Sequence, residues 1–183
     1  MPFWRLYYHL VWATKNREHL IVPGIRDPLY NYIQHKAAEL GVHILAIGGW
    51  VDHVHLLVSI PPTYALADVV RRLKGASAHE MNQIGILDRH FVWQRGYGAL
   101  SCGQKQRPIA IAYIKNQQRH HEKQTTNSWL ERYAASDEGP KRADLVSEKH
   151  SISEESTKYP SERNCPFEIM LRERVRAWIV PLT

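Results

Sequence analysis

An alternation of apolar and more polar side chains over residues 3–14 constrains the fold of this chain more than any other feature. A period of two places successive side chains on opposite faces of a β-strand, so this segment predicts a strand with one buried face. Residues 53–60 alternate in the same way and follow the strand-like segment 43–51 so closely that the two predict a hairpin. Residues 91–100 predict a fourth strand. The apolar face of the first strand consists of Trp4, Leu6, Tyr8, Leu10 and Trp12.

Helices are predicted between and after these strands. The first begins with Asp27 as its N-cap and Pro28 in its first turn, and it ends at Gly41. The second covers residues 65–83, and the third covers 108–123. The order strand-helix-strand-strand-helix-strand-helix is the split βαβ, or ferredoxin-like, pattern with one further C-terminal helix. We therefore predict an α+β fold with an antiparallel sheet, in which strands 3–14 and 53–60 are neighbours.

The charge of the chain is concentrated in its first two-thirds. The 183 residues include 24 Lys and Arg and 18 Asp and Glu, a net charge of +6. Residues 1–124 carry 15 basic and 8 acidic residues, a net charge of +7, whereas residues 125–183 carry 9 and 10, a net charge of −1. We predict a domain over 1–124 that binds a polyanion, followed by an extension over 125–183. Within the extension, composition predicts disorder over 136–164, and apolar residues predict a short amphipathic element over 165–183.

Several classes of protein do not fit the sequence. Cys102 and Cys165 cannot form a disulfide framework, and neither lies in a paired zinc-binding spacing. The first residues lack the order of a secretory signal, and no apolar run approaches the roughly 18 residues of a membrane span. We expect a cytoplasmic protein with no membrane partner.

A pair of histidines lies in the third predicted strand. The period of the strand places His53 and His55 on one face, about 6–7 Å apart along the strand axis. Two imidazoles at this spacing can share one metal cation. On spacing alone, a pair of half-exposed strand histidines is the better-supported interpretation, because His-x-His is a weak motif in isolation.

The last predicted helix carries a tyrosine and a glutamine on one face. Tyr113 and Gln117 are four residues apart, about one helical turn. The simpler interpretation is that the tyrosine packs on the core and the glutamine is solvated, with His120 and His121 as the basic end of the helix. A basic stripe of Lys115, Arg119 and Lys123 on the same helix is suited to DNA phosphates.

Taken together, the histidine pair and the tyrosine helix indicate a specific chemistry. A phenol can attack a phosphodiester, but free tyrosine has a pKa near 10, so it needs a cation that polarises the phosphate. Two histidines and a side-chain amide can hold such a cation. Residues 1–124 contain only eight acidic residues and no obvious carboxylate trio, which disfavours the two-metal carboxylate nucleases.

Other basic side chains complete the predicted DNA surface. If the first and third strands are neighbours, His9 lies beside the histidine pair, where it orients a metal ligand, contacts DNA or is structural. The remaining predicted phosphate contacts, with a solvated face as the alternative, are Lys15 and Arg17 after the first strand and Arg71, Arg72 and Lys74 on the second helix.

These motifs resemble a known family. His53-Val54-His55 resembles the His-hydrophobic-His signature of the HUH endonuclease superfamily. Over residues 3–124 the chain is similar to the single-tyrosine, single-strand transposases of small bacterial insertion sequences, and to their relatives associated with repetitive extragenic palindromes (REPs). The segments that carry the resemblance are 8–15, 52–62, 73–75, 96–98 and 113–121.

The resemblance implies a complete mechanism. Tyr113 would be the nucleophile that forms a 5′-phosphotyrosine, and His53, His55 and Gln117 would bind Mg²⁺ or Mn²⁺. The partners would be single-stranded DNA hairpins and a second copy of the chain, in a homodimer whose tyrosine helices complete each other's sites in trans. Two alternatives remain open: a domesticated nuclease that processes host palindromic repeats, and an inactive hairpin-binding relative. Rolling-circle replication initiators share the histidine pair, but no flanking helicase region is seen. The extension after residue 124 departs from the family pattern.

Overall fold

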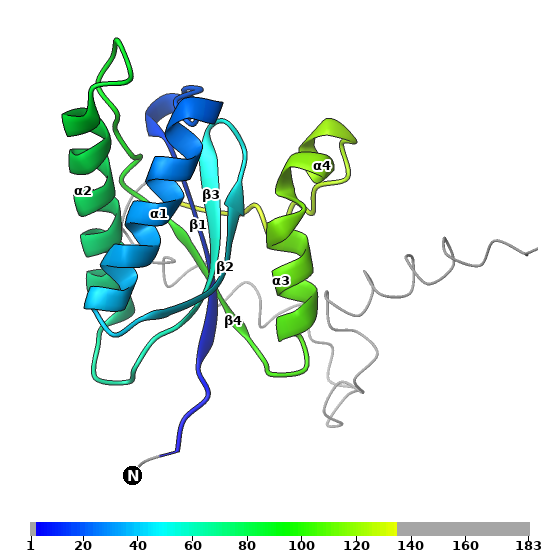
Figure 1. Cartoon of the computed structure of the whole chain (residues 1–183). Coiled ribbons are helices and arrows are strands. Elements are labelled where there is room, and N and C mark those ends of the chain that lie inside the picture. The colour runs from blue at the N-terminus through cyan, green and yellow to red at the C-terminus, as the bar shows by residue number, and fades with distance from the viewer. Residues whose placement is uncertain (1–2, 135–183) are drawn as a thin grey trace, which may run out of the picture. The chain divides into compact units, whose positions relative to one another are not determined.

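The computed structural model describes residues 3–134. The predictions for 136–164 and 165–183 lie outside the described residues. Four strands form one antiparallel sheet in the order β2-β3-β1-β4 (Figure 1). The predicted α+β, ferredoxin-like class and the pairing of the first strand with the third are therefore confirmed. The strands are β1 (Tyr7–Ala13), β2 (His43–Gly49), β3 (His53–Ser59) and β4 (Gly98–Cys102).

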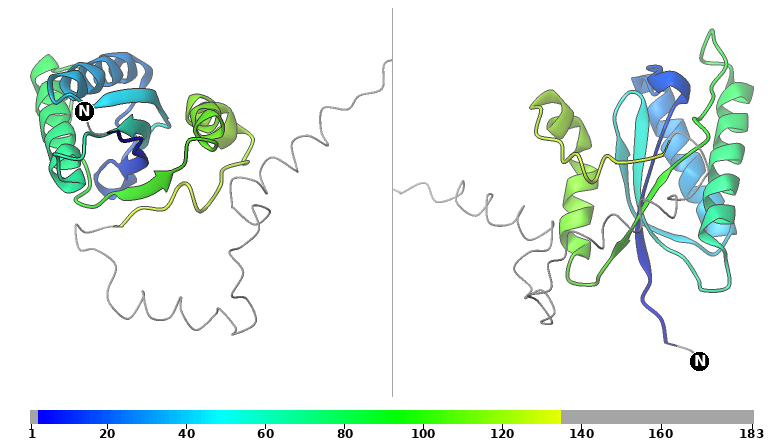
Figure 2. Two further views of the ribbon diagram at one scale, coloured as in Figure 1. Left: turned by 90° about the horizontal axis from the view of Figure 1, so that it is seen from below. Right: turned by 180° about the vertical axis from the view of Figure 1, so that it is seen from behind.

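Helices cover both faces of this sheet. Helices α1 and α2 pack on one face, and α3 and α4 lie on the opposite side, as the views of Figure 2 agree. Among residues 3–134, no helix is both long and apolar enough to cross a bilayer. The helical elements are a 3-10 turn η1 (Lys15–Arg17), α1 (Pro23–Glu39), α2 (Leu66–Ile84), α3 (Arg107–Lys115) and α4 (Gln117–Glu122).

The hydrophobic core lies between the sheet and helices α1 and α2. The apolar sides of β1 and β3 face this core because their period of two places these residues on one face. Helix α1 contributes a residue at every fourth position to the same core. The central residues of the core are Leu10, Trp12, Val54, Leu56, Val58, Ile25, Leu29 and Ile33.

Helix α1 begins one turn earlier than the sequence predicts. Its N-cap is Val22 and Pro23 occupies the first turn, so Pro28 lies inside the helix instead of at its start. The reason is that Ile25 continues the four-residue apolar spacing backwards and is fully buried. Burial of this side chain favours the earlier start although two prolines were available.

The fourth strand is shifted relative to the prediction. β4 covers Gly98–Cys102 instead of 91–100. Phe91 and Trp93 are buried in the core beneath the sheet, where the Trp93 indole donates to Ser77 Oγ at 3.0 Å. These residues therefore pack as core side chains, and only an isolated bridge from Trp93 to Thr14 joins them to β1.

The predicted helix over 108–123 is broken at Asn116. This residue has φ −101° and ψ 17°, and its side-chain amide donates to Ala112 O at 2.7 Å. Asparagine side chains compete with the backbone in this way, which makes them poor residues for a helix interior. The break separates α3, which carries Tyr113, from α4, which carries Gln117.

Candidate active site

Three buried histidines lie on the sheet face that points towards α3. The register of β1 and β3 pairs Val11 with His55, so His9 falls on the same face as His53 and His55. His9 Nε2 lies 2.9 Å from His55 Nδ1, which places His9 beside the pair. Asp52 Oδ1 lies 2.6 Å from His53 Nδ1. With a metal ion bound, each strand histidine would donate from Nδ1 to these neighbours and direct its Nε2 lone pair towards the centre of the site; without a metal, Nε2 can carry a proton and donate to an acceptor there.

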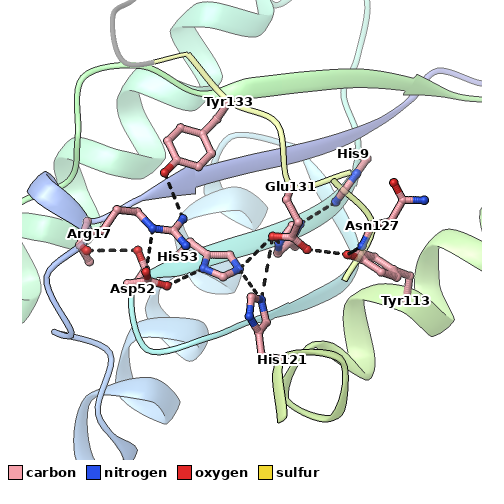
Figure 3. A network of polar contacts seen from close by, with 11 residues as sticks. His9, Arg17, Asp52, His53, Tyr113, His121, Asn127, Glu131 and Tyr133 are labelled. Carbon is pink, nitrogen blue, oxygen red and sulfur yellow. Dashed lines mark hydrogen bonds and ion pairs between the residues drawn. The ribbon is translucent and has the colours of Figure 1, made fainter. Parts of the chain in front are cut away.

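The centre of the site contains a carboxylate that the sequence analysis missed. Glu131 Oε2 lies 3.2 Å from His53 Nε2 and 3.0 Å from His55 Nε2. The Tyr113 hydroxyl donates to Glu131 Oε1 at 2.5 Å. Glu131 thus connects the histidine pair to the tyrosine, and Figure 3 shows it between His53 and Tyr113.

Glu131 belongs to the segment 125–134, which packs on the same unit as the preceding residues and lies beyond the expected boundary at 124. A Cβ atom added at Gly98 would lie 2.0 Å from Arg132 O, so this segment runs directly against β4. Arg17 donates to the Tyr133 hydroxyl at 3.0 Å, which anchors the end of the segment near η1. One signal in the sequence points to this packing: aromatic and apolar residues surround the glutamate in Trp129-Leu130-Glu131-Arg132-Tyr133, and Leu130 is buried.

The site shifts the pKa values of its members in opposite directions. Burial alone would lower the pKa of His53, but hydrogen bonds with Asp52 and Glu131 raise it above its ordinary value. Burial dominates for His55 and lowers its pKa. Burial would raise the pKa of Glu131, yet hydrogen bonds from both histidines and Tyr113 hold it far below its usual range. Burial, followed by the neighbouring Glu131 carboxylate, raises the pKa of the Tyr113 phenol, so the tyrosine is protonated at neutral pH.

Tyr113 and Gln117 both lie inside the site, although the helix between them is broken. The Tyr113 ring packs edge-on to His55, with ring centroids 6.1 Å apart. Gln117 is 1% exposed, and its amide interacts with the Tyr113 phenol, whose pKa it lowers against the larger opposing effects. Within residues 3–134 the amide has no other hydrogen bond. A buried amide with spare donors and acceptors ordinarily meets a water or a ligand. Gln117 is therefore a candidate to bind a ligand, as expected from the sequence.

The two histidines of α4 occupy different positions, and His121 is more than the basic end of a helix. His121 Nε2 lies 3.2 Å from His53 Nε2, and its ring stacks on Trp50 with an interplanar angle of 12°. His120 is buried instead against the Tyr113 ring and lies within 3.0 Å of Thr125 Oγ1.

The predicted DNA-contacting residues fall on two sides of the sheet. Arg17 lies next to the site, because its guanidinium pairs with Asp52 at 2.7 Å. Lys115 and Arg119 line a hollow of about 300 Å³ at the break between α3 and α4. The other exposed basic residues of the prediction are Lys15 in η1, Lys123 at the end of α4, and Arg71 and Arg72 on α2.

Lys74 differs from the other predicted phosphate contacts. Its ammonium is buried and donates to Arg95 O at 2.6 Å and Gly96 O at 2.9 Å. With Arg71 and Trp93 it lines a hollow of about 460 Å³ beside α2, on the side of the sheet away from Tyr113. The bonds of Lys74 hold the loop before β4 in place.

The donor atoms of the site fit a divalent metal ion. The facing atoms of His53, His55 and Glu131 all lie within 4.8 Å of one another. Nitrogen and oxygen donors about 2.0–2.1 Å from one ion lie roughly 3.3 Å apart in a tetrahedral arrangement. The measured separations of 3.0 and 3.2 Å from Glu131 Oε2 to the two imidazoles are close to this value.

Known transposases are similar to this chain in sequence. The ISDra2 transposase TnpA of Deinococcus radiodurans is 40% identical over 78 residues, which are 43% of this chain and 56% of that protein. The chain thus spans little more than half of this relative. The transposase for insertion sequence element IS200 of Salmonella typhimurium is 31% identical over 120 residues, 62% of this chain and 78% of the relative.

Two solved structures of transposases superpose on this fold. A crystal structure of a candidate transposase from Deinococcus radiodurans R1 superposes with a TM-score of 0.53 at 32% identity, covering 63% of this chain and 93% of that one. A REP-associated tyrosine transposase bound to a REP hairpin superposes with a TM-score of 0.51, covering 66% of this chain and 74% of that one. At 16% identity the latter shows the fold alone.

The sequence pattern of a whole family matches this chain as well. The model of the family described as "Transposase IS200 like" matches residues 2–117, well over half of the chain and the part that holds the histidine pair and Tyr113. The chain belongs to the IS200-like transposase family.

Proposed function

We propose that this protein cuts and rejoins single-stranded DNA at the hairpin-marked ends of a mobile element, with Tyr113 as the nucleophile. One observation carries the proposal: the Tyr113 hydroxyl and the imidazoles of His53 and His55 converge on Glu131 in one buried cluster. Membership of the IS200-like family supports it. We further propose that the protein acts in the cytoplasm.

The reaction is a transesterification. The Tyr113 oxygen forms a bond to the scissile phosphorus, and the bond from phosphorus to the 3′-oxygen breaks. The 3′-oxygen takes up a proton and leaves as a 3′-hydroxyl, while the 5′-phosphate remains on the tyrosine. Because the phosphodiester energy is kept, attack by another 3′-hydroxyl rejoins the strand and releases the tyrosine. Glu131 Oε1 accepts the hydroxyl hydrogen bond of Tyr113 and so orients the phenol oxygen, and the proton that Tyr113 loses balances the proton that the leaving 3′-oxygen takes up.

The residues that would hold a divalent cation are His53 and His55, with Glu131 and Gln117 as further donors. Bound Mg²⁺ or Mn²⁺ would polarise the scissile phosphate and favour attack by a phenol whose pKa is raised. Even a free tyrosine is protonated at neutral pH, and the raised pKa of Tyr113 adds to the need for such assistance.

The basic side chains near the site suit a DNA strand. Arg17 pairs with Asp52 beside His53, and Lys15 lies in the same 3-10 turn. Lys115 and Arg119 line a hollow together with Gln117, so these cations can contact phosphates of a bound strand. The net charge of +7 over residues 1–124 supports a polyanion partner. Hairpin recognition and a homodimer with exchanged tyrosine helices stay predictions from the resemblance; in this structure Tyr113 lies against His55 of its own chain.

Covalent capture tests the proposal. The full chain is incubated with single-stranded oligonucleotides that carry the hairpins of the element's own ends, with and without Mn²⁺. We expect an adduct of protein and DNA that requires the metal, and its loss in Tyr113→Phe with hairpin binding unchanged. Tyr64→Phe is a matched control because Tyr64 is exposed and outside the site. Adducts that persist in Tyr113→Phe would show that another residue is the nucleophile. A wild-type chain that binds hairpins but never forms adducts would identify an inactive hairpin-binding relative.

A further inference from the structure

We propose that Arg17 is a positioning residue of the active site: its guanidinium holds the segment 125–134, which carries Glu131, against the strand that carries the histidine pair. In this role Arg17 acts through protein groups and not as a contact for DNA phosphates. The inference rests on the proposed function, and it separates Arg17 from the other basic residues near the site.

The guanidinium of Arg17 joins two parts of the site that are far apart in the sequence. Its Nε donates to Asp52 Oδ2 at 2.7 Å, and the other oxygen of Asp52 lies 2.6 Å from His53 Nδ1. Its Nη1 donates to the Tyr133 hydroxyl at 3.0 Å, and its carbon Cζ lies over the Tyr133 ring, 5.6 Å from the centroid. Figure 3 shows Arg17 between Asp52 and Tyr133. One side chain therefore ties the carboxylate beside His53 to the segment that carries Glu131.

The position of Tyr133 makes this contact relevant to the nucleophile. Tyr133 lies two residues after Glu131, whose Oε1 accepts a hydrogen bond from the Tyr113 hydroxyl. Two residues of chain span at most about 7 Å, so a fixed Tyr133 limits how far Glu131 can move. Release of Tyr133 from Arg17 would therefore loosen the contact that orients the Tyr113 oxygen.

The backbone at Arg17 has a conformation that few residues of this type adopt. Asn16 and Arg17 have φ values of 56° and 59°, in the left-handed region that is costly for residues other than glycine. The turn is closed by the Thr14 hydroxyl, which donates to Glu18 O at 2.6 Å. Such a conformation persists only where the surrounding structure holds it, and it is concentrated at functional sites. Here the turn places the Arg17 side chain on Asp52, whose own side chain is only 8% exposed.

The contacts use the shape of the guanidinium and not only its charge. Nε and Nη1 are two donors of one planar group, and they serve two acceptors on different parts of the chain. A lysine ammonium has the same charge but is a single point of charge on a flexible stem. Arg17→Lys therefore separates the two roles, because it retains the charge that a phosphate contact needs and loses the planar group that positioning needs.

Amide hydrogen exchange of the full-length chain tests the positioning role without DNA. The amides of Asn127 and Ala134 report on the segment, because each donates to a group outside it. We expect Arg17→Gln and Arg17→Lys to speed the exchange of both amides about tenfold, while the amides of β1 and β3 exchange as in the wild type. Arg89→Gln is the matched control, because the exposed Arg89 pairs with Glu18 instead of Asp52.

Salt dependence of DNA binding distinguishes positioning from phosphate contact. The probe is a single strand that carries the hairpin of the element's own end, bound in EDTA. Loss of one phosphate contact reduces the slope of log affinity against log salt by roughly 0.7–0.9. We expect Arg17→Gln to keep the wild-type affinity and slope, whereas its rate of adduct formation with Mn²⁺ falls about tenfold. Arg119→Gln is the comparison, because Arg119 is an expected phosphate contact at the hollow beside Gln117.

Tyr133→Phe provides a second variant should circular dichroism show that Arg17→Gln folds poorly. It keeps the ring beneath the guanidinium, removes only the acceptor hydroxyl and should also speed the exchange of the two amides. Wild-type exchange in all three variants would overturn the proposal, as would a reduced salt slope in Arg17→Gln that Arg17→Lys restores. Faster exchange in the variants of a chain that never forms adducts would refute only the proposed function.

Discussion

Single side chains determine where the lone pairs of the site point. Asp52 accepts from His53 at one oxygen and pairs with Arg17 at 2.7 Å through the other, so one carboxylate connects a metal-ligand candidate to a basic residue at the protein surface. His9 performs the corresponding role for His55 from a different strand. These two neighbours explain why the Nε2 atoms converge, and neither role follows from the His-x-His motif alone.

His9 also predicts a pH dependence of stability. Burial, with the neighbouring His55, lowers the pKa of His9 from 6.5 to about 3. Below pH 6.5 the unfolded chain therefore binds a proton at His9 that the folded chain does not bind until near pH 3. The free energy of unfolding should fall by up to about 1.4 kcal/mol per pH unit in this window from His9 alone.

Urea unfolding between pH 7 and 5, in the presence of EDTA, measures this contribution. We expect the free energy of unfolding of His9→Gln to fall less steeply with decreasing pH than that of the wild type. Equal slopes for the two proteins would show that His9 is not held neutral by its burial.

At the scale of elements, the docking of α3 on β2 and β3 brings the tyrosine to the histidines. Gly48 in β2 allows this close approach, because a Cβ atom there would lie 2.0 Å from Ile114 O. Gln117 and His121 follow Tyr113 at four-residue spacing, so they lie on the same side of the helical segment although it is interrupted at Asn116.

Gly48→Ala should displace α3. The obstacle is a backbone oxygen, which cannot move without its helix, so we expect the free energy of unfolding to fall by about 1–3 kcal/mol. Adduct formation should also fall, because Tyr113 moves with the helix. Gly75→Ala is the matched control: nothing lies within 4 Å of its added Cβ, and alanine is favoured in a helix by about 1 kcal/mol. If Gly48→Ala were as stable as the control, the close approach of α3 would be incorrect.

At the scale of the whole molecule, the segment 125–134 is part of the unit that holds the active site. It supplies Glu131, buries Leu130 and donates from Asn127 N to the Tyr113 hydroxyl at 3.1 Å. The first compact unit extends to Asp137. A chain that stops at 124 therefore loses the hydrogen bonds that join the Tyr113 hydroxyl to Glu131 and Asn127, although it retains the described helices and strands.

Two truncated chains test whether the active-site unit ends at residue 124 or includes residues 125–134. A chain that ends at 137 should keep the melting temperature of the full chain to within a few degrees and retain its Co²⁺ affinity. A chain that ends at 124 should melt at a lower temperature and bind Co²⁺ at least tenfold more weakly. Circular dichroism during heating measures the melting temperature, and titration of the metal-free chain with Co²⁺ measures the affinity. Equal behaviour of the two chains would mean that residues 125–134 do not contribute to the site in solution.

The fold was largely predictable because its signals are local. The period of two in β1 and β3 is a property of neighbouring residues, and it correctly predicted which side chains face the core and which strands are neighbours. The start of α1 and the extent of β4 were wrong, since burial of Ile25 in one case and of Phe91 and Trp93 in the other determined the boundaries. Such burial depends on partners that are distant in the sequence.

The sequence by itself determined the strand that carries His53 and His55, the helix that carries Tyr113 and the family to which the chain belongs. Only the tertiary structure showed that Glu131, 76 residues beyond His55, faces the histidine pair, and that His121 faces it as well. The physical reason is that spacing along one strand or helix places side chains only relative to that element. The convergence of donors from β3, α4 and the segment 125–134 depends on the packing of the whole domain.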